Sequence, residues 1–321
     1  MKKILYIIPY FGKLPTLFPL WLESCRYNPT INWIIFTDDK TVYDYPNNVE
    51  VIYTTFQKIK KRVQELFDFP IALETPYKLC DYKVAYGDIF SNYIDGYDFW
   101  GYCDIDLLWG DIRSFLTDDI LKKYQKIGWL GHSSLYRNNN LMNKLYRCTY
   151  GGASLYKDIF QSNSICFFDE KGINLICKEH NVSIYDNVIF ADLTPLTWNF
   201  QINYVVGDEL LKNRQRIFLK DKEKLYSLSL LHGELFKDSY MYVHFLRRRI
   251  NIEIKSNALN YLIVPNKIIP LLDSFDKSSI TSYSRNNMLK YWIELAIAKR
   301  KKMTIRNIIH YFLERYKATR K

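Results

Sequence analysis

Residues 97–112 read YDFWGYCDIDLLWGDI, and this stretch decides how the chain is interpreted. Asp104 and Asp106 stand one residue apart inside a run of apolar and aromatic side chains. A buried strand normally avoids carboxylates, because an unpaired charge that is taken out of water costs several kcal/mol. On an extended segment residues i and i+2 face the same side, so the two carboxylates are expected to point together.

The chemistry of this pair indicates a divalent cation. Two convergent carboxylates repel each other unless protons or a cation intervene. Oxygen ligands suit a hard ion such as Mg²⁺ or Mn²⁺, and such an ion usually completes its shell with phosphate oxygens. It then stabilises a diphosphate leaving group as negative charge develops. Two exposed acids in a turn, or at a helix N-terminus, are the structural alternative.

The sequence around the pair alternates between strand and helix patterns. Strands are expected at 3–8, 32–39 and 49–54, and a strand followed by a turn at 97–109. Helices are expected at 16–25, 55–67 and 74–94, and shorter late strands at 215–219, 224–231 and 240–246. Strands separated by helices imply βαβ units, hence an α/β fold with a mostly parallel sheet. Ligands of such sheets bind outside the carboxyl ends of the strands. The loops Pro9–Gly12, Asp38–Asp39 and Asp104–Asp106 are therefore expected at one edge.

The composition fits one large globular domain with an appendage. Of the 321 residues 48% are hydrophobic and 25% charged, so a substantial core is expected. The six cysteines show no CxxC pair and no metal-ligand spacing with histidine, which predicts reduced thiols in a cytoplasmic protein. The apolar segment Ile4–Ile8 is too short for a signal peptide, and no apolar run reaches the length of a membrane span.

The formal net charge of +11 belongs almost entirely to the C-terminal tail. Residues 285–321 hold eleven Lys and Arg against two Glu, which leaves a net charge of about +2 for residues 1–284. A nucleic-acid partner is not expected, because the body lacks a basic stripe. Apolar positions between Ile305 and Tyr316 follow helical spacing and predict a basic amphipathic helix. Such a helix either lies on an anionic membrane surface, here the inner face of the cell membrane, or packs on its own domain.

Several segments together resemble bacterial GT-A-fold glycosyltransferases of capsule and exopolysaccharide gene clusters. They are IIPYFG (7–12), FTDD (36–39), PYKLCDYKVAYG (76–87), WGYCDIDLLWGDI (100–112) and MYVHF (241–245). The resemblance runs from about Lys2 to Pro265, which implies a glycosyltransferase domain at 1–265 and a basic helical extension at 266–321. The implied fold is GT-A-like (Rossmann-like), with a mixed, mostly parallel sheet flanked by helices. The implied activity moves a hexose from a nucleotide diphosphate sugar, with UDP-sugars favoured, to a glycan acceptor that we expect to be lipid-linked.

The resemblance also implies roles for individual residues. Asp104 and Asp106 would hold Mn²⁺ or Mg²⁺ on the donor diphosphate. His244 is similar to the late histidine that completes the metal shell in glycogenin-like and lipooligosaccharide-type retaining transferases. The residues expected to bind the nucleotide sugar are Pro9, Tyr10, Phe11, Gly12, Asp38, Asp39, Lys78, Asp81, Lys83, Asp104 and Arg247.

The pattern departs from the resembled enzymes after His244. The expected Gly-x-Lys-Pro-Trp segment is missing, and Arg247–Arg249, which suit phosphate binding, follow instead. The resemblance therefore leaves retaining or inverting stereochemistry open. Asp169 and Glu170 are the catalytic candidates, because a carboxylate in about this place accepts the acceptor's proton in inverting enzymes; the same pair also suits the start of a helix. Further acceptor-side candidates are His132, Asp186 and Gly151–Gly152.

Two other classes of protein remain as alternatives. A haloacid-dehalogenase-type phosphatase also uses Asp-x-Asp after a strand, with the first Asp as nucleophile. It would carry the motif at its first strand, followed by a small residue and Thr or Val, whereas here Leu-Leu-Trp follows Asp106. The other alternative is a non-enzymatic protein that binds nucleic acid or a membrane through its basic tail. The sequence favours the transferase.

Overall fold

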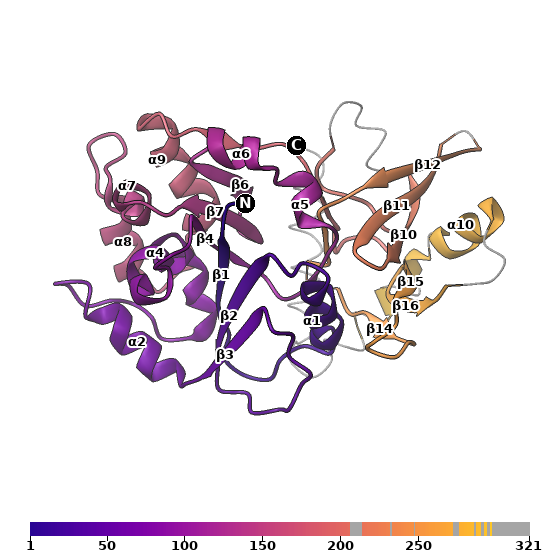
Figure 1. Ribbon diagram of the computed structural model, residues 1–321, viewed down its shortest axis with the longest axis horizontal. Coiled ribbons are helices and arrows are strands. Elements are labelled where there is room, and N and C mark those ends of the chain that lie inside the picture. The colour runs from indigo at the N-terminus through magenta and orange to yellow at the C-terminus, as the bar shows by residue number, and fades with distance from the viewer. Residues whose placement is uncertain are drawn as a thin grey trace.

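The computed structural model describes residues 1–205, 214–231, 233–246, 248–271, 276–285, 287–289, 292, 293 and 296. Within these residues a seven-stranded sheet organises the first half of the chain (Figure 1). Its strands are β1 (Ile4–Pro9), β2 (Ile31–Thr37), β3 (Val49–Tyr53), β4 (Phe99–Cys103), β6 (Lys126–Leu130), β7 (Ser133–Arg137) and β8 (Ile184–Tyr185). Their order is β3-β2-β1-β4-β7-β6-β8. Only β7 is antiparallel to its neighbours, so this sheet is mixed and mostly parallel, as expected.

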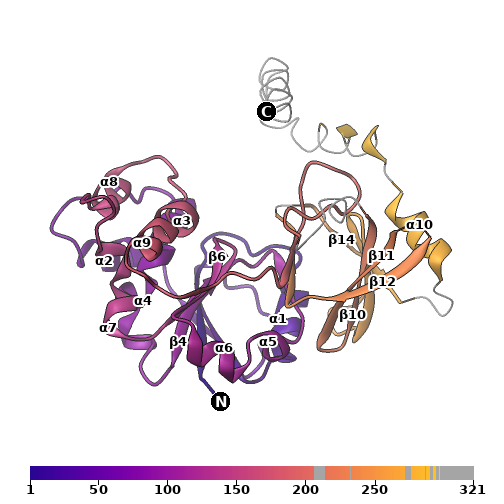
Figure 2. The ribbon, with the colours of Figure 1, turned by 90° about the horizontal axis from the view of Figure 1, so that it is seen from above.

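Helices cover both faces of this sheet. The α-helices are α1 (Phe18–Arg26), α2 (Phe56–Gln64), α3 (Leu79–Tyr82), α4 (Tyr86–Ile89), α5 (Ile112–Phe115), α6 (Asp118–Lys123), α7 (Asn140–Asn143), α8 (Leu155–Gln161), α9 (Ile173–Glu179) and α10 (Lys277–Ser284). The tighter turns are η1 (Pro76–Lys78), η2 (Lys83–Ala85), η3 (Ser91–Tyr93) and η4 (Leu145–Arg147), and the wider π-turn is η5 (Phe168–Gly172). Figure 2 shows α2, α4, α7, α8 and α9 on one side of the sheet and α1 and α5 on the other.

The central strand β1 is buried on both faces. Ile4 and Tyr6 pack into the core on the α1 side, whereas Leu5 and Ile7 pack into the core on the opposite side. A strand that is covered twice reads as a continuous apolar run, which is how the sequence indicated it. The strand and helix predictions over residues 3–67 are confirmed within a few residues.

The prediction of one continuous helix over 74–94 is wrong. The chain instead forms η1, α3, η2, α4 and η3 in succession. A Cβ at Gly87 would lie 2.4 Å from the indole of Trp100, so the backbone of α4 packs directly on β4. The 3₁₀ turns tighten the path of the chain around this contact.

A second sheet follows in the C-terminal part (Figure 1). Its strands are β10 (Gln215–Asp221), β11 (Lys224–Leu231), β12 (Glu234–Ser239), β14 (Asn251–Ile252), β15 (Asn260–Val264) and β16 (Lys267–Pro270). Within the described residues the order is β12-β11-β10-β15-β16-β14, and α10 packs on this sheet through the buried Ile280. The boundary predicted between Pro265 and Asn266 falls inside the β15–β16 hairpin. The amphipathic helix predicted in the tail lies outside the described residues.

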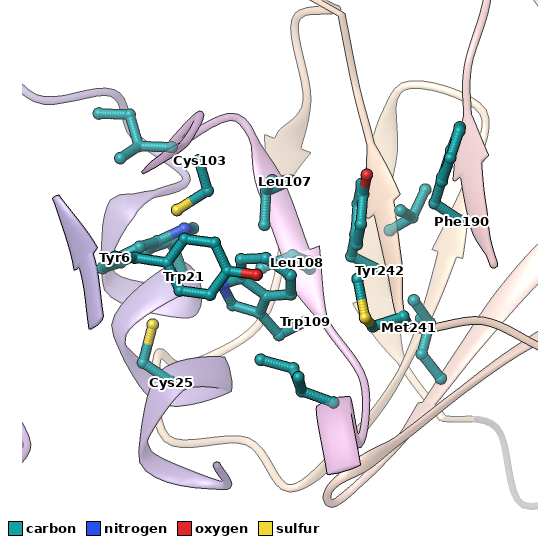
Figure 3. Close-up of a cluster of buried hydrophobic side chains, with 14 of the residues drawn as sticks. Tyr6, Trp21, Cys25, Cys103, Leu107, Leu108, Trp109, Phe190, Met241 and Tyr242 are labelled. Carbon is teal, nitrogen blue, oxygen red and sulfur yellow. The ribbon is translucent and has the colours of Figure 1, made fainter. Parts of the chain in front are cut away.

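A small third sheet, with the order β5-β13-β9, joins these layers. Its strands are β5 (Leu107–Trp109), β9 (Phe190–Asp192) and β13 (Tyr242–His244). β13 runs antiparallel to β5 and parallel to β9. Figure 3 shows Tyr242 of β13 between Phe190 of β9 and Trp109 of β5, within the core that also holds Tyr6 of β1. The third sheet is thus buried in the same core as β1.

The expected α/β class with helices flanking a mixed sheet is therefore confirmed. The six cysteines, all within the described ranges, are free thiols, as expected. In the part of the chain that the structure describes, no helix has the length and apolar character needed to span a bilayer.

Candidate functional site

The site lies at the point where the strand order of the large sheet reverses, between β1 and β4. β1 and β4 are parallel neighbours. The chain leaves β1 toward β2 on one side, whereas after β4 it passes through β5 of the third sheet before it reaches β6 and β7 on the other side. Loops that diverge in this way open a crevice at the carboxyl ends of the strands, where α/β proteins bind ligands. Asp104 follows β4 at this edge, and Tyr10 follows β1. Burial and the negative charges of Asp106 and Asp39 raise the pKa of Tyr10.

Three strand ends deliver Asp104, Asp106 and His244 to this edge. Asp104 comes one residue after β4, Asp106 comes just before β5, and His244 is the last residue of β13. The Phe245 N–H donates to the Asp106 carbonyl at 2.9 Å, and the Asp104 N–H donates to the His132 carbonyl at 2.9 Å. These backbone bonds fix the positions from which the three side chains converge.

The side chains of this triad are spaced as metal ligands would be. Nε2 of His244 lies 3.3 Å from Oδ1 of Asp106 and 3.9 Å from Oδ2 of Asp104. One ligand atom from each residue lies within 4.8 Å of the other two. The three residues could hold a divalent cation, because carboxylate oxygens and an imidazole nitrogen are ligands for such ions. The Asp104 and Asp106 side chains are 35% and 32% exposed, which leaves one side of the set open to a ligand.

The positive charge of His244 offsets the repulsion between the carboxylates of Asp104 and Asp106. Burial alone would lower the pKa of His244. Hydrogen bonds with Asp106 and Asp192 have the larger, opposite effect and raise this pKa to about 10. Without a metal the ring is therefore an imidazolium that balances the carboxylates. An ion at this place would take over that balance and displace the proton from Nε2, because metal-ligating imidazole is neutral.

A second set of contacts holds His244 on its Nδ1 side, opposite the Nε2 that faces Asp104 and Asp106. Its Nδ1 lies 2.7 Å from Oδ1 of Asp192, and Nδ2 of Asn203 donates to Oδ2 of Asp192 at 2.6 Å. Burial raises the pKa of Asp192, but the hydrogen bonds with His244 and Asn203 and the charges of the neighbouring histidines together lower it below its ordinary value. Asp192 is therefore a buried anion.

Lys83 ties the triad to a further carboxylate. Its Nζ donates to Oδ1 of Asp104 at 2.7 Å and to the carbonyl of Gly131 at 2.8 Å, and it lies 3.7 Å from Oδ2 of Asp169. Burial lowers the pKa of Lys83, but Asp104 and Asp169 raise it well above its usual range. Lys83 is thus a fixed positive charge at the base of the site.

Asp169 and Glu170, the catalytic candidates, lie next to Lys83 in the turn η5. Asp169 is 4% exposed, and burial, opposed by Lys83, raises its pKa to about 7. Glu170 is partly exposed, and its Oε1 accepts the Gly131 N–H at 3.0 Å. Neither carboxylate caps the turn, since Phe167 occupies its N-cap position. The structure therefore brings both residues to the site.

A model of a family of unknown function, DUF6625, matches residues 6–272. The chain belongs to DUF6625. No curated protein matches it. The match contains Asp104, Asp106, Asp192 and His244, so the whole triad and its support lie inside the region shared with the family. The basic tail at 285–321 lies beyond the match.

Two residues of this DUF6625 chain that were expected to bind the nucleotide sugar have a structural role. Lys78 and Asp81 form a buried ion pair at 2.8 Å. Nζ of Lys78 also donates to the carbonyls of Ile159 and Ser164, and Asp81 accepts the backbone N–H of Phe168. All of these contacts brace the segment that leads into Asp169. The expectation that Lys78 and Asp81 contact phosphate or sugar does not agree with their complete burial.

The loop after β1 meets the acids after β2, as expected. Oδ1 of Asp38 accepts the Gly12 N–H at 2.7 Å, and Oδ2 of Asp39 accepts the Leu14 N–H at 2.9 Å. Gly12 has a φ of 94°, a conformation that favours glycine. The two aspartates thus shape the loop that carries Tyr10. The other predicted members are Pro9, the last residue of β1, and Phe11, whose ring lies 5.7 Å from that of Phe56, whereas Arg247 lies outside the described residues.

The weaker acceptor-side candidates separate in the DUF6625 structure. His132 lies directly behind the triad: its Nδ1 is 2.8 Å from the Tyr242 hydroxyl, its ring centroid is 4.6 Å from that of His244, and burial lowers its pKa to about 3. Asp186 is exposed after the edge strand β8. Gly151–Gly152 form an exposed turn with positive φ at both residues, as the structural alternative expected.

Sequence reasoning missed Asp192, Asn203 and Gly131. Asp192 had a usable signal, because it follows the apolar run VIFA in the same way that acids follow the other strands. Asn203 and Gly131 stand in segments with no such pattern. Their role depends on pairing between distant parts of the chain.

Proposed function

We propose that this protein is a metal-dependent glycosyltransferase that moves a hexose from a nucleotide diphosphate sugar, with UDP-sugars favoured, to a glycan acceptor. The observation that carries the proposal is the convergence of Asp104, Asp106 and His244 at the open edge of the switch point between β1 and β4. The finer fold that we propose is GT-A-like. The strand order around β1 and the Asp-x-Asp turn after β4 support it.

In this proposal the chain's own residues bind and orient the donor. Asp104, Asp106 and His244 would hold Mn²⁺ or Mg²⁺, which stabilises the negative charge on the departing nucleoside diphosphate. Lys83 fixes Oδ1 of Asp104 and leaves the opposite oxygen toward His244. Tyr10, on the loop held by Asp38 and Asp39, provides an aromatic wall beside the carboxylates.

In this proposal Asp169 and Glu170, both in the turn η5, lie on the acceptor side of the site. Glu170 is partly exposed and suits a proton acceptor for the attacking hydroxyl, whereas the buried Asp169 suits a partner that holds Lys83. We place the acceptor in surface polysaccharide biosynthesis and propose that it is lipid-linked at the inner face of the cell membrane. The basic tail supports this part of the proposal through its charge.

The contacts of Asp104 argue against the phosphatase alternative. A nucleophilic aspartate must offer an oxygen to the phosphorus atom, but Asp104 follows the fourth strand of the fold and accepts a 2.7 Å hydrogen bond from Lys83. The charge distribution argues against a nucleic-acid-binding function, because residues 1–284 carry a net charge of only about +2.

Thermal unfolding in the presence of nucleotide sugars tests the proposal. UDP-, GDP- and CDP-hexoses are added with Mn²⁺ or with EDTA, and one class is expected to raise Tm only when Mn²⁺ is present. A ligand at 100 times its Kd stabilises by about 2.7 kcal/mol, which is a shift of several degrees. Asp104→Asn and Asp106→Asn are expected to abolish both this shift and sugar transfer, whereas Asp119→Ala, at an exposed carboxylate on α6, retains both. Full transfer by either site variant, or no Mn²⁺-dependent shift with any donor, overturns the proposal.

A further inference from the structure

The third sheet places Asp192 directly beside His244. The two residues are paired in the register of β9 and β13, and the Leu193 N–H donates to the His244 carbonyl at 3.0 Å. Both side chains are almost fully buried, at 5% and 3% exposure. Nδ1 and Oδ1 lie 2.7 Å apart, so Asp192 accepts a charge-assisted hydrogen bond from the imidazole.

Asn203 fixes the other end of Asp192. Its side-chain amide donates to Oδ2 at 2.6 Å, and its backbone N–H donates to the Asp192 carbonyl at 2.8 Å. The carboxylate therefore has one oxygen for Asn203 and one for His244. Both oxygens of the carboxylate are therefore engaged, and this arrangement favours a proton on Nδ1 of His244.

The same region contains a second group of possible ligands, namely His132, Asp192 and His244. An ion bound at about 2.1 Å to both Nδ1 of His244 and Oδ1 of Asp192 would hold them about 3 Å apart or more. The observed 2.7 Å is a hydrogen-bond length instead. In addition, Nδ1 of His132 is engaged by the Tyr242 hydroxyl. The inner group is therefore a hydrogen-bonded support, which leaves the outer triad as the candidate ion site.

We propose that Asp192, held by Asn203, is a positioning residue for the metal centre. By keeping the proton on Nδ1, Asp192 turns the lone pair of Nε2 toward Asp104 and Asp106, which is the form of histidine that binds a cation. Carboxylates behind metal-binding histidines have this effect in general, and their removal weakens metal affinity by about 10- to 100-fold. This inference rests on the proposed function, because it requires that the outer triad binds the ion.

Mn²⁺ affinity of the full chain, measured by electron paramagnetic resonance without any sugar substrate, tests the inference. Asp192→Ala is expected to weaken Mn²⁺ binding about 10- to 100-fold. Asp192→Asn keeps an acceptor oxygen without the charge and is expected to fall between Asp192→Ala and the wild type. Asp88→Ala is the matched control, because it removes another largely buried carboxylate, one that binds Arg147 away from the site, and it is expected to leave Mn²⁺ affinity unchanged.

A double-mutant cycle separates positioning from a general loss of structure. In a His244→Ala background the Asp192→Ala change is expected to have almost no further effect on Mn²⁺ affinity, because its action passes through His244. Asn203→Ala, which leaves the carboxylate in place but frees it, is expected to weaken affinity in the same direction and serves if Asp192→Ala does not fold. Unchanged affinity in the Asp192 and Asn203 variants, or an equal loss in both His244 backgrounds, overturns the inference and leaves the proposed function standing. A wild type with no Mn²⁺ affinity overturns both.

Discussion

Asp104 and Asp106 stand at the end of a buried strand with cationic side chains against them. Lys83 binds Asp104 from one side, and the imidazolium of His244 lies against both carboxylates from the other. His244 is buried and Lys83 is largely so, and the carboxylates beside them raise the pKa of both cations. The cost of burying Asp104 that the sequence pointed to is thus offset by partners that lie 21 and 140 residues away along the chain.

The raised pKa of Asp169 predicts how stability depends on pH. Its pKa is about 7 in the folded protein, against an ordinary value of 3.8. Between these values the folded state binds more protons than the unfolded state, so the contribution of Asp169 to stability falls as pH rises and is constant above about pH 7. The Asp169→Asn variant has no titrating carboxyl group at this position, so it does not lose stability in this way as pH rises. We therefore expect the Tm of the variant, relative to the wild type, to rise from pH 5 to pH 7 and then level off.

Thermal denaturation in matched buffers across this pH range provides the measurement. Asp158→Asn, at an exposed position of α8, is the matched control for removing one carboxylate. A difference between Asp169→Asn and the wild type that is the same at every pH contradicts the raised pKa.

At the scale of elements, the connection between β6 and β7 depends on a glycine. A Cβ at residue 131 would lie 2.3 Å from Oδ2 of Asp169 and 3.1 Å from Oε1 of Glu170. Gly131 also binds Lys83 through its carbonyl and Glu170 through its N–H. We expect Gly131→Ala to push the Asp169 carboxylate away from Lys83, to lower the free energy of unfolding by about 1–3 kcal/mol, and to reduce transfer.

A double-mutant cycle checks the cause of this effect. Asp169→Ala removes the atoms that the new methyl group would strike, so Gly131→Ala is expected to cost less stability in that background. Chemical denaturation of the four proteins gives the coupling. Costs that simply add would contradict the close contact between Gly131 and Asp169.

Some helices and strands could be predicted from the sequence, and others could not. β1 and β2 are covered on both faces, so their apolar runs were readable without any partner. The segment at 74–94 kept apolar spacing but broke into short turns, because its path follows the contact between Gly87 and Trp100. β12 was missed because it is an exposed edge strand whose sequence, ELFKDS, carries mostly polar residues.

The whole molecule is joined by pairings that no local pattern encodes. The third sheet unites residues 107–109, 190–192 and 242–244. The sequence therefore predicted Asp104 and Asp106 from their own spacing and His244 from a resemblance, but gave no reason to connect Asp192 or Asn203 with them. The edge at which these residues meet was predictable, since it follows from the parallel order of the strands. The contacts within the site were not, because they depend on register between distant strands.

The uneven distribution of charge over the molecule leads to a prediction about membranes. Residues 1–284 carry a net charge of about +2, and residues 285–321 carry the remainder of the +11. Each Lys or Arg near an anionic leaflet contributes about 1 kcal/mol at best, and the attraction is screened by salt. We expect a chain that ends at residue 284 to lose most of its sedimentation with phosphatidylserine vesicles while it keeps its turnover on a soluble acceptor.

A full-length variant with Gln at 299–302 removes four positive charges without shortening the chain. It is expected to lose part of its sedimentation with the vesicles, and added salt is expected to cause a similar loss in the wild type. Equal sedimentation of the truncated and full-length proteins at low ionic strength would show that the tail's charge does not bring the protein to a membrane, and would leave packing on its own domain as its role.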